Sequence, residues 1–268
     1  MIEFSSRQFP ILFRKSWRTT GLADRIQEID ADALCAEYDR LRNAAPSRSA
    51  VGKRHFVRHD GRLQARDPIR TSEEHLAIAL WRNERLLRPA GGRQHFLDYQ
   101  FPLQGSARAD AGLGQVDLLG STDQGRLMVV ELKVRRAHSS KGDAPVLALM
   151  EGLRYAAVVH ANRCDIAAEA RTCFNIVVAD VPPIVQLLGP ACWWDGWRDM
   201  SASTRRAAGQ WESRFLELSA RLESRLGIVV ECASLEGAEL HDVTRDAHGP
   251  ILGHAPQMHM VHLAESNV

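Results

Sequence analysis

The sequence predicts an α/β protein in which a mixed central β-sheet is flanked by helices. Three apolar, strand-like runs follow one another at 95–103, 114–120 and 127–134, with short links that favour an antiparallel meander. Segments with helical periodicity lie before and after these runs, at 71–88 and 146–160. A further apolar run follows the second helix, so this helix is expected to cross over the sheet and return the chain to it.

The composition is that of a soluble globular protein. Of the 268 residues, 45% are hydrophobic and 25% are charged, which argues against a disordered or coiled-coil chain and allows a substantial core. The 34 Lys and Arg residues nearly balance the 33 Asp and Glu residues, so any affinity for nucleic acid must come from local charge. Five cysteines without a CxxC pair, no recognisable signal peptide and no uninterrupted apolar stretch of about 20 residues predict a cytoplasmic protein without a membrane partner.

Residues 1–70 are predicted to form a helical and basic extension. Apolar side chains recur at helical spacing over 22–43, which indicates a helix. Between positions 42 and 70 there are eight basic and two acidic residues, the clearest local change in composition. This basic segment is either a solvated surface or an arm that contacts phosphate groups. The candidate phosphate ligands in it are Lys53, Arg54 and Arg58.

The two helices of the central part, residues 71–180, have clear local signals. The helix at 71–88 is expected to begin with a capping box between Thr71 and Glu74, and Pro89 would end it. The helix at 146–160 is almost entirely apolar, which predicts that it is buried.

Residues 181–268 are predicted to form a C-terminal extension packed on this central core, so that the whole chain is one compact unit. The four tryptophans Trp193, Trp194, Trp197 and Trp211 are expected to pack against the core, with stacking on bases as the alternative. The elements expected after 160 are a strand at 173–179, a loop at 181–200, a helix at 203–226 and strands at 228–233 and 257–263.

Ionisable residues interrupt two neighbouring apolar strands. Asp117 lies within the run Val-Asp-Leu-Leu, and Glu131 and Lys133 lie within the next strand. Because side chains alternate along a strand, Glu131 and Lys133 point to one face and Leu132 points into the core. Asp117 and Glu131 are expected to be cross-strand neighbours if the register allows. Two carboxylates beside an ammonium suit a hard divalent cation such as Mg²⁺ and the hydrolysis of a phosphodiester. The plain structural alternative is a salt bridge on a half-exposed sheet.

This pattern resembles the PD-(D/E)XK nuclease superfamily, whose fold is the restriction-endonuclease-like α-β-β-β-α-β core. The resemblance rests on Asp117 followed fourteen positions later by Glu131-Leu132-Lys133, and it covers about 71–180. It implies that Asp117 and Glu131 bind the metal with the Leu132 carbonyl group, and that Lys133 is the catalytic lysine. The family often adds a glutamate from the first helix, which is Glu73 or Glu74 here; helical phase favours Glu73.

The sequence also departs from the family pattern. Val116 replaces the proline of the motif. Some branches carry Gln and, four residues later, Tyr on the second helix, and this chain has Glu151 and Tyr155 at that spacing. Further candidates for contact with nucleic acid follow the motif directly: Arg135, Arg136 and Lys141.

The sequence therefore predicts a nuclease that uses Mg²⁺, or alternatively Mn²⁺, to hydrolyse phosphodiester bonds in DNA. The alternative is a catalytically inactive module of the same fold that binds nucleic acid or protein. Homodimerisation is allowed by the sequence but has no specific signal in it.

Overall fold

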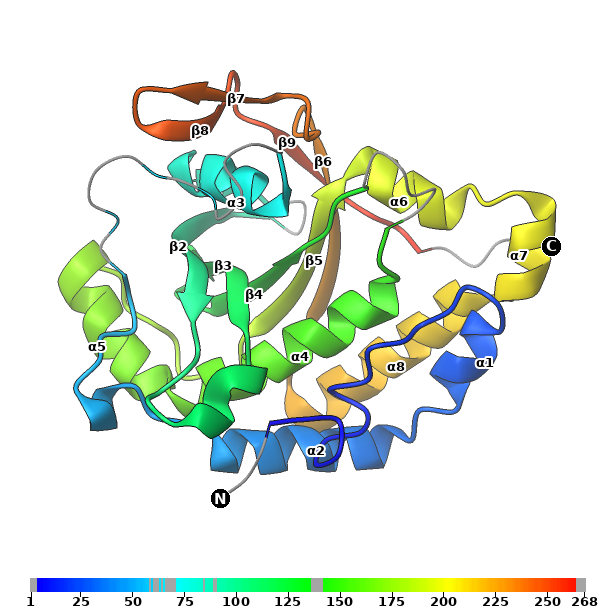
Figure 1. Ribbon diagram of the computed structural model, residues 1–268, viewed down its shortest axis with the longest axis horizontal. Helices are drawn as coiled ribbons and strands as arrows, with labels where there is room; N and C mark the ends of the chain where they lie inside the picture. Colours follow the sequence, from blue (N-terminus) through cyan, green and yellow to red (C-terminus); the bar gives the residue numbers. More distant parts are fainter. Residues whose placement is uncertain are drawn as a thin grey trace.

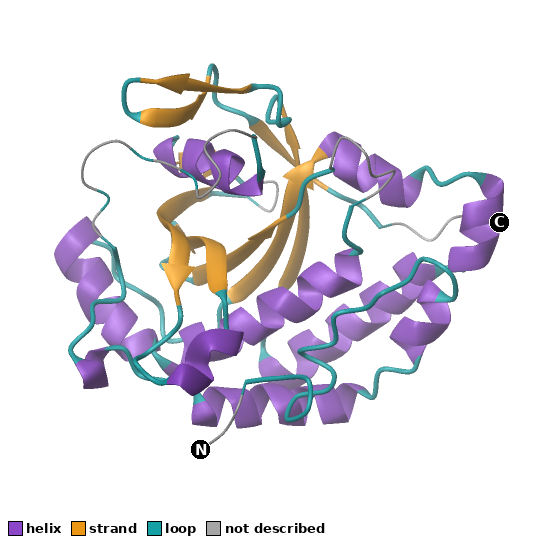
Figure 2. Ribbon diagram, in the orientation of Figure 1, coloured by secondary structure: helices purple, strands orange, loops and turns teal. Residues whose placement is uncertain are grey.

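In the described part of the chain, seven strands form one mixed central sheet with helices on both faces (Figures 1 and 2). The computed structural model describes residues 4–57, 59, 63, 65, 71–83, 85–88, 91–135 and 142–263. The strand order is β1-β2-β3-β4-β5-β6-β9, with β5 parallel to β4 and to β6 and the other neighbours antiparallel. The strands are β1 (Arg85–Leu87), β2 (Arg93–Pro102), β3 (Gln115–Thr122), β4 (Leu127–Leu132), β5 (Ile184–Pro190), β6 (Val230–Glu236) and β9 (Gln257–Met260). The predicted fold class, an α/β protein with a mixed sheet between helices, is confirmed.

Helices cover the two faces unequally. The helix α4 (Pro145–Ala161) lies directly on the sheet, and α1 (Leu22–Gln27), α2 (Ala31–Ala44) and α8 (Trp211–Leu226) form a further layer outside it (Figure 1). The opposite face carries α3 (Glu73–Arg82) and a small hairpin of β7 (Val243–Asp246) and β8 (Gly249–Leu252). The remaining helices are η1 (Ser49–Val51), η2 (Arg108–Gly112), α5 (Arg163–Phe174), α6 (Ala191–Arg198) and α7 (Ala202–Ala208).

Alternation along β4 explains why the sheet has a hydrophobic core on each face. Leu127 and Val129 pack toward α4, whereas Met128, Val130 and Leu132 pack toward α3. The four tryptophans of the C-terminal part are fully buried in the core on the α4 face, as expected from the sequence. Among the described residues, no helix combines the length and apolar character that a membrane span requires.

Several predicted helices end earlier than their periodicity suggests. The first is divided into α1 and α2, because Asp30 caps α2 by accepting hydrogen bonds from the main-chain N–H groups of Asp32 and Ala33. The helix predicted at 71–88 stops at Arg82, and the chain then forms the edge strand β1. The long helix predicted at 203–226 is divided at Gly209. This residue follows the last residue of α7 and has a φ of 69°.

The capping prediction for α3 was wrong. Ser72, not Thr71, is the N-cap, and its N–H group donates to Nδ1 of His75 at 3.3 Å. His75 therefore fills the position that the sequence analysis gave to Glu74.

The strand predicted at 173–179 was also wrong, and the strand after α4 is β5. Residues up to Phe174 continue α5, which ends where Asn175 takes a φ of 56°, and Phe174 and Val177 are exposed. The core strand β5 lies in the region 181–200, which was predicted as a loop because it is rich in Trp and Pro. Gln186 is buried with hydrogen bonds to Gln94 and Glu231, which removes the cost of its polar group. The short β7–β8 hairpin has no counterpart among the sequence predictions.

Gly152 controls how closely α4 approaches the sheet. A Cβ atom at this position would lie 2.5 Å from Cγ1 of the buried Val185 and 3.9 Å from Cβ of Glu131. We expect Gly152→Ala to lower the free energy of unfolding by about 1 kcal/mol, because an overpacking cost of about 1–3 kcal/mol exceeds the helix-propensity gain of about 1 kcal/mol. Urea unfolding measures this change. Gly253→Ala is the control, since a Cβ there meets nothing within 4 Å; equal stability of the two variants would contradict this role for Gly152.

Candidate active site

The pairing of β3 with β4 brings Asp117 and Glu131 together. Leu118 pairs with Val130, so Asp117 and Glu131 are the next residues on the two strands. Asp117 Oδ2 accepts a hydrogen bond from the main-chain N–H group of Leu132 at 3.0 Å. The cross-strand arrangement anticipated from the sequence is therefore present, and the hydrogen bond fixes the Asp117 carboxylate against the end of β4.

Gln100 on β2 holds the other oxygen of Asp117. Its Nε2 atom lies 3.3 Å from Asp117 Oδ1, and its own main-chain carbonyl group accepts a hydrogen bond from Gln115. Gln100 has a φ of 46°, which is unusual for a residue other than glycine. Sequence analysis missed this residue, because nothing in a strand pattern signals a left-handed backbone at a glutamine.

Lys133 lies between two carboxylates at the end of β4. Its Nζ atom is 2.6 Å from Glu131 Oε1 and 2.9 Å from Glu151 Oε2 on α4. Lys133 and Glu131 are buried, with exposed fractions of 6% and 3%. Glu151 on α4 thus pairs with Lys133, which is also paired with Glu131.

Glu73 joins this group from the first turn of α3. The charge of Glu74, in the same turn, contributes to the raised pKa of Tyr99. Burial and the charge of Asp117 raise the pKa of Glu73 to about 8, against the opposing effect of Lys133. The negative charge of Asp143, in the loop before α4, raises the pKa of Glu73 further. Asp143 was not among the site residues predicted from the sequence. The charges that shift the pKa of Glu73 are those of Asp117, Lys133, Asp143 and Glu151, so Glu73 belongs electrostatically to this cluster.

Among the described residues, the carboxylates outnumber the ammonium group that they surround. Burial raises the pKa of Asp117 to about 6 and raises that of Glu131 well above its usual value, with Lys133 opposing both shifts. Burial favours a lower pKa for Lys133, but Glu131, Glu73, Glu151 and Asp117 together hold it well above the usual value. Burial likewise favours a higher pKa for Glu151, but Lys133 holds it below the usual value. The cluster therefore has excess negative charge that a further cation would stabilise.

The cluster opens to solvent on one side. Asp117, Glu73 and Glu151 are partly exposed, whereas Glu131 and Lys133 lie beneath them. Tyr155, one turn after Glu151 on α4, is buried, and its hydroxyl group accepts a hydrogen bond from Arg154 at 2.9 Å. Within the cluster, solvent therefore reaches Asp117, Glu73 and Glu151 in part, whereas Glu131, Lys133 and Tyr155 are buried.

The basic candidates are placed differently. Lys53 lines a groove beside the cluster, and its Nζ atom donates to the main-chain carbonyl group of Gly105 at 2.6 Å. Arg54 instead faces α5, where it lies 3.3 Å from Sγ of Cys173. Arg135 is exposed, and its positive charge opposes the rise in the pKa of Cys192 at the start of α6. Arg58, Arg136 and Lys141 lie outside the described residues.

The donor chemistry of the cluster suits a hard divalent cation. Asp117, Glu131 and Glu73 offer carboxylate oxygens, and Glu131 Oε2 is buried without a hydrogen bond from the described residues. Within the described part of the chain, no three Asp, Glu, His or Cys side chains are already arranged around a metal position. Lys133 contacts Glu131 through Oε1, so Oε2 is the oxygen of Glu131 that could bind a cation while the ion pair is kept.

Comparison of the chain with protein-family models, with curated proteins and with solved structures gives no match. Function must therefore be inferred from the chemistry of the site itself.

The raised pKa of Glu73 predicts a pH-dependent stability. A carboxyl group whose pKa is higher in the folded state than in the unfolded state favours folding while it is protonated. We therefore expect this contribution to be lost as the pH rises from 4.5, the usual value, to about 8. Glu73→Gln removes this loss. In EDTA, its stability relative to the wild type should increase across this pH range by up to about 5 kcal/mol, since each pKa unit corresponds to about 1.4 kcal/mol, and then level off.

Urea unfolding at a series of pH values measures this difference. Glu74→Gln is the matched control, since it removes the same charge from the same turn of α3. A Glu73→Gln advantage that is constant from pH 4.5 to pH 8 would show that Glu73 is not held near the other carboxylates.

Proposed function

We propose that this protein is a metal-dependent nuclease of the PD-(D/E)XK type that hydrolyses phosphodiester bonds in DNA. The observation that carries the proposal is the convergence of Glu73, Asp117 and Glu131 on Lys133 from three separate elements. The order α3-β1-β2-β3-β4-α4-α5-β5 supports it, because it contains the α-β-β-β-α-β succession with two additions: the edge strand β1 after α3, and α5 before the last strand. The restriction-endonuclease-like core is part of this proposal.

Asp117 and Glu131, with the Leu132 carbonyl group, are the residues that would hold Mg²⁺ or Mn²⁺, and Glu73 is the auxiliary ligand. When bound, such an ion polarises a phosphodiester and lowers the pKa of a water molecule beside it. Gln100 and the N–H group of Leu132 orient Asp117 by their hydrogen bonds to its two oxygens. The chain thus supplies both the oxygen ligands and the groups that fix their direction.

Lys133 suits charge stabilisation better than proton abstraction. Its surroundings hold its pKa well above the usual value, so it carries a proton at neutral pH. A protonated lysine cannot accept a proton from water, but it can donate a hydrogen bond to the negative charge that develops on the phosphate group. Charge stabilisation, and not proton abstraction, is therefore the role of Lys133 that agrees with its surroundings.

The second candidate is an inactive module of the same fold that binds nucleic acid or protein. The ion pair between Lys133 and Glu151 favours it, because the lysine is engaged by two carboxylates and is buried. In this case the cluster would stabilise the fold and would not act on a substrate.

A cleavage assay with Asp117→Asn separates these two functions. The variant keeps an oxygen that accepts the hydrogen bond from Leu132 but loses the charge, so we expect it to fold and to retain less than about 1% of the cleavage rate. Plasmid, linear duplex and single-stranded DNA are each incubated with Mg²⁺ or Mn²⁺, and products are resolved on gels.

Asp123→Asn is the matched control for this assay. Asp123 also accepts a main-chain hydrogen bond, from Arg93 at 2.8 Å, but it lies in the turn at the opposite end of β3. We expect it to cut at the wild-type rate. Metal-dependent cutting that survives in Asp117→Asn would contradict the assigned site, and DNA binding without cutting by the wild type would favour the inactive module.

A further inference from the structure

A groove of about 460 Å³ lies beside the start of β3. None of the residues that line it belongs to the carboxylate cluster, and the lining comes from two stretches that are far apart in the sequence, 48–53 and 102–115. We call it the cationic groove. It is lined by Arg48, Lys53, Gln104, Gly105, Gly114 and Gln115, among other residues.

The cationic groove has two positive side chains, and no carboxylate of the described residues lines it, although the charges of Glu169 and Asp98 act on Arg48 from outside the lining. Main-chain carbonyl groups hold both cations in place: Arg48 Nη1 lies 2.6 Å from the oxygen of Gln104, and Lys53 Nζ lies 2.6 Å from that of Gly105. Asp110 lies behind Gly105, accepts a hydrogen bond from the N–H group of Ala107, and is not part of the lining. Since an ammonium group has three donors and a guanidinium group has five, both cations keep donors for an anion.

The groove is connected to the carboxylate cluster through two glutamines. Gln115 in the groove wall donates to the main-chain oxygen of Gln100 at 3.1 Å, and Gln100 donates to Asp117. At the neighbouring position, a Cβ atom on Gly114 would lie 2.9 Å from the hydroxyl oxygen of Tyr155. These contacts place the wall of the cationic groove next to Asp117.

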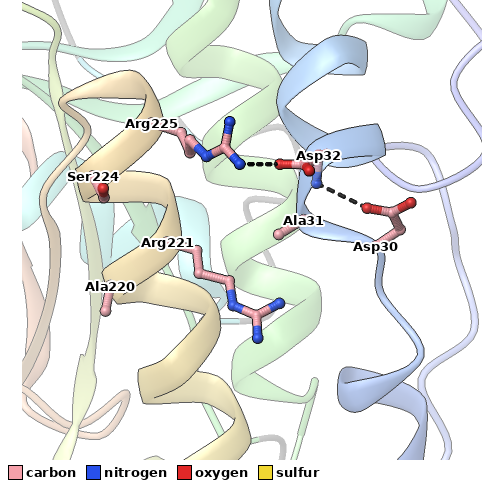
Figure 3. Close-up of a pocket in the computed structure, with 7 residues that line it drawn as sticks. All are labelled: Asp30, Ala31, Asp32, Ala220, Arg221, Ser224 and Arg225. Carbon is pink, nitrogen blue, oxygen red and sulfur yellow. Dashed lines mark hydrogen bonds and ion pairs between the residues drawn. The ribbon is translucent and has the colours of Figure 1, made fainter.

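A second groove shows how a cationic surface is neutralised elsewhere in the molecule. It lies between the start of α2 and α8, measures about 380 Å³, and contains Arg221 and Arg225 (Figure 3). Asp30 and Asp32 line the same groove, and Arg225 pairs with Asp32 at 2.9 Å. Its charges are balanced, so it is suitable as a control surface.

We infer that the cationic groove binds the sugar-phosphate backbone of a DNA strand next to the phosphate group that is cut. This inference rests on the proposed nuclease function and adds to it the path of the substrate. Lys53 is the principal contact. Its ammonium group uses one of its three donors for the main-chain oxygen of Gly105 and keeps the others for phosphate. The contact is with phosphate, so it does not depend on base sequence.

The test measures DNA binding in EDTA, where metal-dependent cutting does not occur. Fluorescence anisotropy of a labelled duplex and a labelled single strand is recorded at several KCl concentrations. We expect Lys53→Ala to weaken binding about 3- to 10-fold and to reduce the salt slope by about 1, as for the loss of one phosphate contact. Lys53→Arg should restore most of the affinity, and Arg221→Ala should match the wild type.

The salt slope distinguishes a phosphate contact from a merely structural role for Lys53, which would leave the slope unchanged. The inference is overturned if Lys53→Ala keeps the wild-type affinity and slope, or if the wild type binds neither DNA. A wild type that binds through Lys53 but never cuts with Mg²⁺ or Mn²⁺ would support the groove and contradict the nuclease.

Discussion

The ammonium group of Lys133, buried among carboxylates, is the interaction on which the rest of the structure depends. An unpaired buried carboxylate is costly, and breaking a buried ion pair typically costs about 3–5 kcal/mol. Lys133 pairs with Glu131 and Glu151, but Glu131, Asp117 and Glu73 still have raised pKa values. The fold thus keeps more carboxyl groups than cations at one place, with strongly shifted pKa values. Such shifts are more typical of functional sites than of structural ion pairs.

The elements around the cluster hold its carboxyl groups close together. The absence of a side chain at Gly152 lets α4 approach the sheet, which brings Glu151 to Lys133. On the opposite face, the bidentate ion pair between Arg82 and Asp246 joins α3 to the β7–β8 hairpin. The C-terminal part, which carries no readable motif, therefore helps to position the helix that presents Glu73.

The carboxylate cluster was easier to predict than the fold around it. Asp117, Glu131 and Lys133 stand out because ionisable residues rarely interrupt apolar strands, and Glu73 follows from helical phase. Long-range pairing decided what local patterns could not: Gln186 is tolerated in β5 because Gln94 and Glu231 bond to it, whereas the more apolar run ending α5 is exposed. The role of Gln100 could not be predicted for the same reason, since its hydrogen bond to Asp117 forms only where β2 pairs with β3.

The central claim is that this excess of negative charge constitutes a site for a divalent cation. Titration of the metal-free protein with Mn²⁺, followed by electron paramagnetic resonance of the free ion, tests it without any substrate. The account predicts that the wild type removes Mn²⁺ from solution and that Asp117→Asn weakens this binding at least tenfold, because a charged ligand is lost. Equal uptake by the two proteins, or none by the wild type, would mean that Lys133 and its carboxylates form a structural ion-pair network.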